Sequence, residues 1–217
     1  MTDAERRFTS VPVEIRAGSD NLTIGGYAAK FNRMSQNLGG FVERIDPGFF
    51  NKSRGDGWPG VIARHNHDDN MLLGTTGART LTLGLDEIGL AYDVNLPQTR
   101  MDVYELVQRG DVRQSSFAFI AFEDDWGTSD QGFPLRTLVT GQLKDVASVN
   151  TPAYEDTSVG LRSLAKKFDA DLEEVRKMAA ENELMRFFKR TDKQEPQRRS
   201  SQSALAKALA LDPNTTL

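Results

Sequence analysis

Apolar and polar residues alternate over short runs through most of the chain, as far as about residue 159. Alternation with a period of two is typical of β-strands, because successive side chains of a strand point to opposite faces. Breaks containing Gly, Asp or Pro separate the runs. The pattern predicts strands at residues 11–16, 22–31, 42–45, 61–64, 80–85, 90–94, 117–122, 135–139 and 146–149. About nine short strands favour a β-barrel or a β-sandwich.

Two helices are predicted among the strands. A short one follows Asp46-Pro47, since aspartate can cap a helix and proline is tolerated at its first position. A better-marked helix covers residues 99–109, with Thr99 as its candidate N-cap and Gly110 as a natural stop. Its apolar face consists of Val103, Leu106 and Val107.

Helical periodicity replaces strand alternation beyond Thr157. Glycine nearly disappears, and apolar residues recur at helical spacing at Leu161, Leu164, Phe168, Leu172, Val175 and Ala179. This predicts a domain of residues 1–162 followed by an amphipathic helix over residues 163–189. Residues 190–217 are polar and charged, with only a marginal short helix at 204–211, so we expect a largely disordered tail.

Composition narrows the possible chemistry. The 217 residues suit one ordinary domain with an appendage. Cysteine is absent, which excludes disulfides, thiolate metal sites and a cysteine nucleophile, so a nucleophile would have to be an oxygen. The net charge of −4 and the lack of a strongly basic domain argue against nucleic acid as the main partner. Since no run of about eighteen apolar residues and no signal-like start occur, we expect a soluble protein with no membrane partner.

The only two histidines, His65 and His67, lie two residues apart. Histidine is the side chain that most readily accepts and returns a proton near neutral pH, so a general base has few other places in this chain. On a strand the two rings would share a face and could hold a metal ion, but a third ligand is missing, because Asp68 and Asp69 are too close in sequence. We therefore expect no metal. The plain alternative is a pair of surface residues in a polar loop.

Ser115 and Ser116 precede an apolar run about fifty residues later. Alternation places Phe117 and Phe119 on one face, most simply toward the core, and Ser116 on the other face. A hydroxyl held by such a stiff strand suits a nucleophile. Taken alone, however, a serine in this position is more often just the residue at which a strand begins.

Asp145 lies among apolar residues on a third predicted strand, sharing a face with Leu143, Ala147 and Val149. A buried carboxylate needs a partner. A histidine ring N–H is a suitable partner, and the contact would fix the tautomer of the ring. An ion pair with a lysine or arginine is the alternative.

These stretches, in this order, resemble the prohead (capsid maturation) proteases of tailed bacteriophages of the HK97 type. The resemblance covers most of residues 11–163. It rests on five motifs: residues 25–31, residues 41–50, the His67-Asp68 pair with Leu73-Gly74, the element Ser116-Phe117-Ala118-Phe119, and the strand from Asp145 to Thr151-Pro152-Ala153-Tyr154. Three positions depart from the family pattern: Ala118 replaces glycine, Asp145 replaces glutamate and Ala147 replaces serine.

The resemblance implies a serine endopeptidase with the fold of the herpesvirus assemblin proteases. That fold is a closed antiparallel β-barrel with peripheral helices, in keeping with a mainly β (α+β) chain. Ser116 would be the nucleophile, His67 the general base and then acid, and Asp145 the residue that orients the imidazole. The related viral enzymes use a second histidine as third member, but His65 would lie beside His67 rather than behind it. Accessory candidates are His65, Ser115 and Arg113, with Arg113, Arg136 or backbone N–H groups as oxyanion donors.

The family also implies partners and a location. Its members are enclosed in the immature capsid in the host cytoplasm, where they cut the scaffolding region of the major capsid protein and themselves, without a cofactor. We expect the helix from Ser163 onward to act in targeting, with its apolar stripe bound to scaffold helices or to a second copy; a helix folded back on its own barrel is the alternative. The alternative function is a catalytically inactive assembly or scaffold-like protein.

Overall fold

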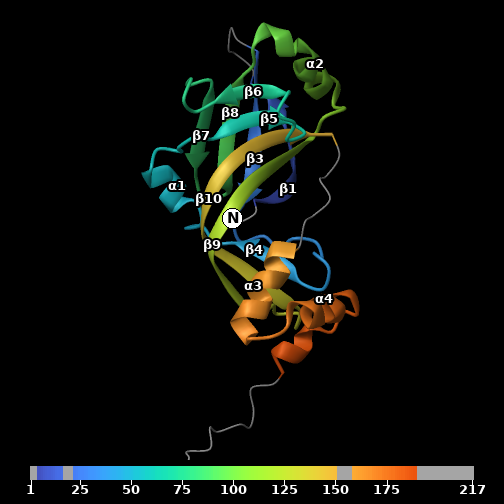
Figure 1. The fold of residues 1–217 in the computed structure, drawn as a ribbon. Coiled ribbons are helices and arrows are strands. Elements are labelled where there is room, and N and C mark those ends of the chain that lie inside the picture. The colour runs from blue at the N-terminus through green and yellow to red at the C-terminus, as the bar shows by residue number, and fades with distance from the viewer. Residues whose placement is uncertain (1–3, 17–21, 151–157, 190–217) are drawn as a thin grey trace, which may run out of the picture.

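The computed structural model describes residues 4–16, 22–150 and 158–189 (Figure 1). The chain is mainly β with a smaller share of helix, as the alternation predicts. The strands are β1 (Glu5–Pro12), β2 (Glu14–Ile15), β3 (Thr23–Lys30), β4 (Val42–Ile45), β5 (Ile62–His65), β6 (Leu72–Thr75), β7 (Leu81–Leu85), β8 (Gly89–Asn95), β9 (Gln114–Thr128) and β10 (Pro134–Val149). The helices are α1 (Asn51–Gly55), α2 (Met101–Arg109), α3 (Ser158–Phe168) and α4 (Leu172–Ala180), with 3-10 turns η1 (Gln98–Arg100) and η2 (Leu184–Phe187).

The strands form two sheets that pack face to face. The large sheet has the order β1-β9-β10-β5-β6, with β4 also paired to β10, and the small sheet has the order β2-β3-β8-β7. β4 and β5 run parallel to β10, so the expected wholly antiparallel pairing is wrong. The reason is that the chain between β4 and β5 stays alongside β10, where Asp46 N donates to Leu138 O and Gly141 N donates to Phe49 O. These pairings leave two separate sheets, and the closed barrel stays a prediction.

β9 and β10 make one long hairpin of 15 and 16 residues. The sequence pattern divides β10 into two strands, but register shifts between Leu138 and Asp145 let a single strand bend and continue. Gly141 lies within this bent stretch. A Cβ added there would approach the Phe49 ring to 2.2 Å, so the bend depends on glycine.

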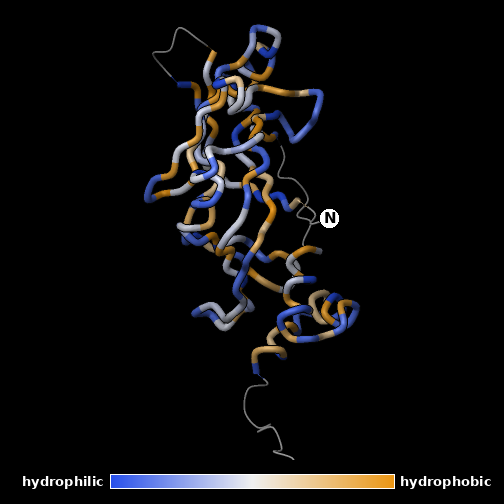
Figure 2. Tube along the Cα trace, turned by 60° about the vertical axis from the view of Figure 1, so that its left-hand side comes forward, coloured by the Kyte–Doolittle hydropathy of each residue, from blue (hydrophilic) through white to orange (hydrophobic). Residues whose placement is uncertain are grey.

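Two hydrophobic clusters stabilise the chain. Figure 2 shows hydrophobic segments both among the strands and in the C-terminal helices. The first fills the space between the sheets, where Phe49, Phe117 and Phe119 are essentially unexposed. Phe49 packs edge-on against Phe119 with ring centroids 5.3 Å apart. The second lies between the far end of the β9–β10 hairpin and the C-terminal helices (Figure 1).

Two helices replace the single helix expected over residues 163–189. α3 already begins at Ser158, so the expected domain boundary after residue 162 falls inside it. α3 ends at Phe168, the next residue, Asp169, has a positive φ of 48°, and Asp171 then caps α4 by accepting from Glu173 N at 2.9 Å.

The apolar stripe of these helices is covered by the chain itself. Leu164 and Val175 are fully buried in a cluster with Phe41 and Trp126. The expectation that the stripe is free to bind scaffold helices or a second copy is therefore wrong, because the hairpin end supplies its partner. The predicted tail, residues 190–217, and the motif at residues 151–154 lie outside the described residues.

The helix at residues 99–109 is confirmed apart from its start. Gly110 ends α2 in the left-handed conformation, at a φ of 78°, as predicted. Thr99 lies in the preceding 3-10 turn, and the N-cap position belongs to Arg100, which makes no capping bond. None of the described helices is long and apolar enough to span a membrane.

Candidate active site

Ser116 lies near the start of β9 and faces away from the core. Its neighbours Ser115 and Phe117 point between the two sheets, where Ser115 Oγ lies 3.0 Å from the hydroxyl of Tyr92. Burial raises the pKa of Tyr92 to about 12, so that hydroxyl stays neutral. Ser115, an accessory candidate, is thus directed away from Ser116 by the alternation of the strand.

His67 reaches Ser116 from a turn rather than from a strand. β5 ends at His65, and both Asn66 and His67 adopt left-handed conformations, with φ of 54° and 55°. Asn66 N donates to Ser148 O at 2.9 Å, which fixes the turn against β10. The expectation that the two rings share a strand face is wrong, because the turn rotates His67 away from His65.

A continuous set of hydrogen bonds joins Ser116, His67 and Asp145. His67 Nε2 lies 2.7 Å from Ser116 Oγ, and His67 Nδ1 lies 2.6 Å from Asp145 Oδ1. The carboxylate can only accept at Nδ1, so a neutral ring carries its proton there and offers Nε2 to the hydroxyl. The paired strands set this arrangement, since Asp145 on β10 lies opposite Ala118 on β9, two residues from the nucleophile candidate.

Arg64 binds the other oxygen of Asp145, which is fully buried. Arg64 Nη2 donates to Asp145 Oδ2, and Nη1 donates to the exposed Asp69. Burial favours the neutral acid, but the hydrogen bonds and charges of His67 and Arg64 outweigh it and lower the pKa of Asp145. The two kinds of partner that the sequence leaves open for this carboxylate, histidine and arginine, both bind it. The sequence does not identify Arg64 as a site residue, because only the parallel pairing of β5 with β10 brings Arg64 next to Asp145.

His65 belongs to a different set of hydrogen bonds. Its Nδ1 lies 3.1 Å from Ser148 Oγ, and its Nε2 lies 3.1 Å from the side-chain amide nitrogen of Asn66. The amide can only donate, so Nε2 accepts and Nδ1–H donates to Ser148. Burial lowers the pKa of His65, which keeps the ring neutral. The two histidines therefore bind separate partners on β10 and do not converge on one point.

The hydroxyl of Ser116 has a second contact, with the main chain of β1. Ser116 Oγ lies 2.8 Å from the carbonyl oxygen of Arg7, and Phe8 is directly opposite Ser116 in the β1–β9 pairing. A hydroxyl has one proton to donate. When His67 is neutral, the Ser116 hydroxyl donates this hydrogen bond to His67 Nε2. When His67 is protonated, Nε2–H donates to Oγ instead, and the hydroxyl can donate to the Arg7 carbonyl oxygen. β1 also leaves Ser116 fully buried.

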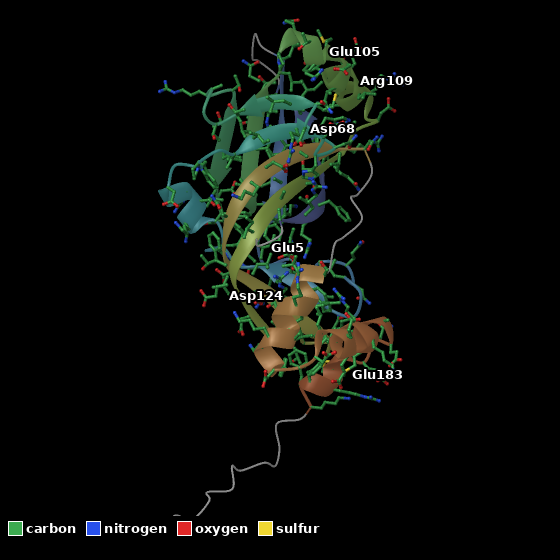
Figure 3. All side chains as sticks on the ribbon, viewed as in Figure 1. Glu5, Asp68, Glu105, Arg109, Asp124 and Glu183 are labelled. Atoms are coloured by element: carbon green, nitrogen blue, oxygen red, sulfur yellow. The ribbon has the colours of Figure 1, made fainter. Side chains whose placement is uncertain are left out.

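The two candidate oxyanion arginines are engaged elsewhere. Arg136 is buried in an ion-pair cluster, where its Nη1 lies 2.6 Å from Glu5 and 3.0 Å from Glu43. Burial works against the charge, but the carboxylates outweigh it and raise the pKa of Arg136. Figure 3 labels Glu5 and Asp124 of this cluster, between the sheets and α3. Arg136 as an oxyanion donor is therefore wrong. The exposed Arg113 donates instead to Gly110 O at 2.7 Å, beside the end of α2.

Comparison with known proteins agrees with the five-motif resemblance. A family model described as caudovirus prohead serine protease matches residues 9–171, which include Ser116, His67 and Asp145. No curated protein and no solved structure matches the chain. Because the matched residues make up most of the sequence, the chain belongs to the caudovirus prohead serine proteases, a family of serine peptidases.

Proposed function

We propose that the chain is a serine endopeptidase of phage capsid maturation, with Ser116 as nucleophile, His67 as general base and acid, and Asp145 as orienting acid. Its substrates are the scaffolding region of the major capsid protein and the chain itself, inside the prohead in the host cytoplasm. The observation that carries the proposal is the chain of short hydrogen bonds from Ser116 Oγ through His67 to Asp145, at 2.7 and 2.6 Å.

The geometry suits acyl transfer to an oxygen nucleophile. His67 Nε2 takes the proton of Ser116 as Oγ attacks the substrate carbonyl carbon, and the imidazolium then returns this proton to the leaving amine. Asp145 stabilises the imidazolium through Nδ1–H. Hydrolysis of the acyl-enzyme repeats the sequence with water in place of Ser116. In such triads, loss of one member typically lowers the rate by about 10⁴ or more.

The cycle starts with the departure of β1 from the nucleophile. The substrate carbonyl must approach Oγ, and the Arg7 carbonyl oxygen lies 2.8 Å from that atom. β1 is an edge strand of the large sheet, with β9 as its paired neighbour. Edge pairing of this kind opens at a lower free energy than the central strands of a sheet, so substrate can gain access without global unfolding.

The burial of Ser116 favours a second candidate, a catalytically inactive assembly protein that keeps the protease fold. Coexpression with the capsid protein separates the two. The protease predicts capsid protein cleavage that is lost in Ser116→Ala and retained in Ser115→Ala, the matched change one residue away. Persisting cleavage in Ser116→Ala would refute this nucleophile, and absent cleavage in the unaltered chain would support the second candidate.

A fluorophosphonate probe tests the same site without a known cleavage sequence. Such probes phosphonylate an activated serine hydroxyl, and the adduct is located by peptide mass spectrometry. We expect the label on Ser116, and we expect it to disappear in His67→Gln but not in His65→Gln. A label on another serine, or equal loss in both histidine variants, would mean that the hydrogen-bonded set is not the catalytic one.

A further inference from the structure

β1 and β3 come together at one end and separate at the other. Near Pro12, a Cβ added to Gly26 of β3 would lie 2.9 Å from the Pro12 carbonyl oxygen, and the next strand, β2, pairs with β3. Toward the start of β1, the strand pairs with β9 alone, and the end of β3 pairs with β8 alone. Two strand edges of the described chain therefore face each other without a strand between them.

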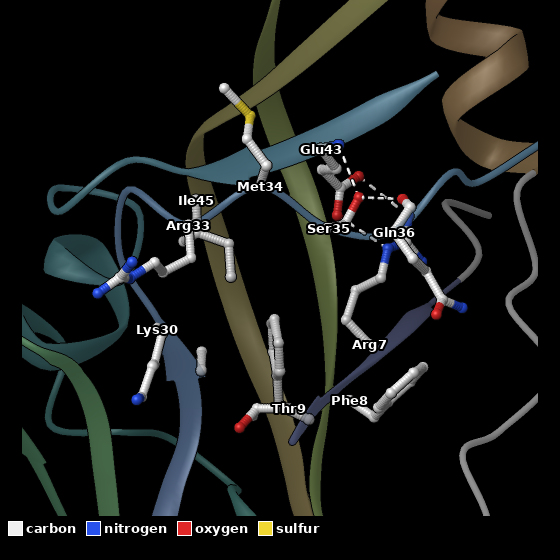
Figure 4. A pocket seen from close by; sticks show the side chains of 12 residues that line it. Arg7, Phe8, Thr9, Lys30, Arg33, Met34, Ser35, Gln36, Glu43 and Ile45 are labelled. Atoms are coloured by element: carbon white, nitrogen blue, oxygen red, sulfur yellow. Dashed lines mark hydrogen bonds and ion pairs between the residues drawn. The ribbon is translucent and has the colours of Figure 1, made fainter. Parts of the chain in front are cut away.

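A pocket of about 460 Å³ occupies this gap, which we call the seam. Its walls come from residues 7–9 of β1, from Ala29 and Lys30 of β3, from the loop at residues 33–36 and from β4 (Figure 4). Buried Ala29 and Phe117 line its apolar part, and the exposed Met34 borders it. Phe117 lines the pocket and points to the other face of β9 from Ser116, whereas Arg7 of β1 borders both the pocket and, through its carbonyl oxygen, the Ser116 hydroxyl.

The free charges at the seam are positive. Lys30 and Arg33 lie together on one side of the pocket in Figure 4, and neither side chain makes an ion pair or hydrogen bond with a described residue. Arg7 and Glu43 also border the pocket, but they bind each other at 2.8 Å. Arg136 adds a second guanidinium to Glu43 at 3.0 Å. The carboxylate is therefore neutralised, whereas the two cations are available to a ligand.

We propose that the seam binds an extended acidic peptide segment of a partner chain, which adds as a strand between β1 and β3. Unpaired strand edges supply main-chain hydrogen bonds to such a peptide, and alternate side chains of the peptide would enter the apolar pocket. Acidic side chains on the segment complement Lys30 and Arg33. This interaction goes beyond the proposed catalysis, and binding does not require Ser116 to react. A bound segment would also hold β1 in the position that covers Ser116.

The strand edges distinguish a peptide from other anions. A nucleic acid or a free phosphate could pair with the two cations but has no backbone amides to pair with β1 and β3. A peptide bound as proposed would close the gap between the two sheets. It would therefore protect amide protons on both strands from exchange with solvent.

Binding is tested with the full chain carrying Ser116→Ala, which prevents cleavage of the probe. The probe is a fluorescein-labelled nine-residue peptide in which Glu and Val alternate, so that all Glu side chains share one face of the strand, and it is compared with the same peptide carrying Lys for Glu. Fluorescence anisotropy should show saturable binding of the acidic peptide and at least roughly tenfold weaker binding of the basic one.

The double variant Lys30→Glu, Arg33→Glu should weaken binding of the acidic peptide by a similar factor. The control Arg79→Glu, Lys166→Glu makes the same change of net charge at two exposed cations that do not line the seam, and it should leave binding unchanged.

Hydrogen exchange distinguishes strand addition from a purely electrostatic contact. Binding of the acidic peptide should slow the exchange of backbone amide protons at both residues 6–9 and residues 27–30. The proposal is overturned by absent binding, by binding without protection of these residues, or by equal competition from an oligonucleotide. Self-association of the chain that the Lys30→Glu, Arg33→Glu change abolishes would assign the seam to a second copy and overturn it as well.

Discussion

The main-chain carbonyl oxygen of Arg7 lies 2.8 Å from Oγ of Ser116, so the chain's own first strand occupies the space beside its candidate nucleophile. The side chain of Arg7 holds β1 in place through Glu43 of β4, at 2.8 Å, and Glu5 of β1 binds Arg136 of β10 at 2.6 Å. The described structure is thus a closed form of the site, in which the proton-transfer groups are assembled but shielded.

Opening of β1 should limit the reactivity of Ser116. We expect the rate of fluorophosphonate labelling to rise with urea at concentrations well below the unfolding transition, because urea favours local opening of an edge strand. Labelling that is quenched at a series of times and analysed by mass spectrometry measures this rate, and circular dichroism locates the unfolding transition. A rate that stays flat until global unfolding would show that access does not require β1 to open.

Arg64 should set the acid limit of the site. Arg64→Met removes a charge that lowers the pKa of Asp145, so that pKa rises toward its ordinary range. A carboxylate whose pKa is lower in the folded than in the unfolded chain stabilises the fold. This stabilisation is complete above the pKa of the unfolded chain and is lost as the pH falls through the pKa of the folded chain. The variant should therefore lose labelling and stability at a higher pH than the unaltered chain, with a cost of about 2 kcal/mol near neutral pH.

Two companion variants test the charge at Arg64. Arg64→Lys keeps the charge without the guanidinium geometry and should recover part of the acid tolerance. Asp69→Asn removes only the other contact of Arg64, where Asp69 is 90% exposed, and should change stability by no more than about 0.5 kcal/mol. Identical pH profiles for all of these proteins would contradict the role of Arg64.

His65 should affect stability more than chemistry. Burial lowers its folded pKa, so below about pH 6.5 the unfolded chain takes up a proton that the folded chain does not. The free energy of unfolding should fall as pH decreases through this range, and it should fall less steeply in His65→Gln. Urea denaturation between pH 5 and 7.5 measures the two slopes. Equal slopes would mean that His65 is not the group responsible.

Gly141 should be the least replaceable glycine of the long hairpin. An alanine Cβ would meet the Phe49 ring at 2.2 Å, and the carbonyl oxygen of Ile120 lies 2.8 Å from the same point. We expect Gly141→Ala to lower the free energy of unfolding by about 1 to 3 kcal/mol, measured by urea denaturation. Gly84→Ala on β7 is the control, since nothing lies within 4 Å of its added Cβ. A loss no larger at Gly141 than at Gly84 would show that the ring moves aside freely.

Local pattern carries information about Ser116 and Asp145 because each lies on a strand whose faces differ in polarity. Alternation suffices to direct Phe117 and Phe119 into the core, where both are buried. It fails at His67, where a left-handed turn breaks the strand period. The predicted strand ends at Arg64, and the reading that extends it through both histidines would put their rings side by side. The turn explains why one ring faces Ser116 and the other faces Ser148.

Long-range pairing is what the pattern does not contain. Nothing near Arg64 in the sequence indicates Asp145, and nothing near Arg7 indicates Ser116; each contact follows from which strands become neighbours. The ion-pair cluster of Arg136 is of the same kind, since its partners Glu5, Glu43 and Asp124 come from three other strands. The helical stripe of α3 and α4 shows the converse, because its period is evident but its covering partner is not.

β10 runs as one strand from Arg136, beside the C-terminal helices, to Asp145 at the candidate site. Its hairpin partner, β9, carries Trp126 of the second hydrophobic cluster and Phe117 and Phe119 of the first, so the hairpin connects the two clusters. The same two strands carry Ser116 and Asp145, so the packing of α3 and the candidate site depend on one hairpin. A single pair of long strands thus joins the C-terminal helices to the two candidate residues that flank His67.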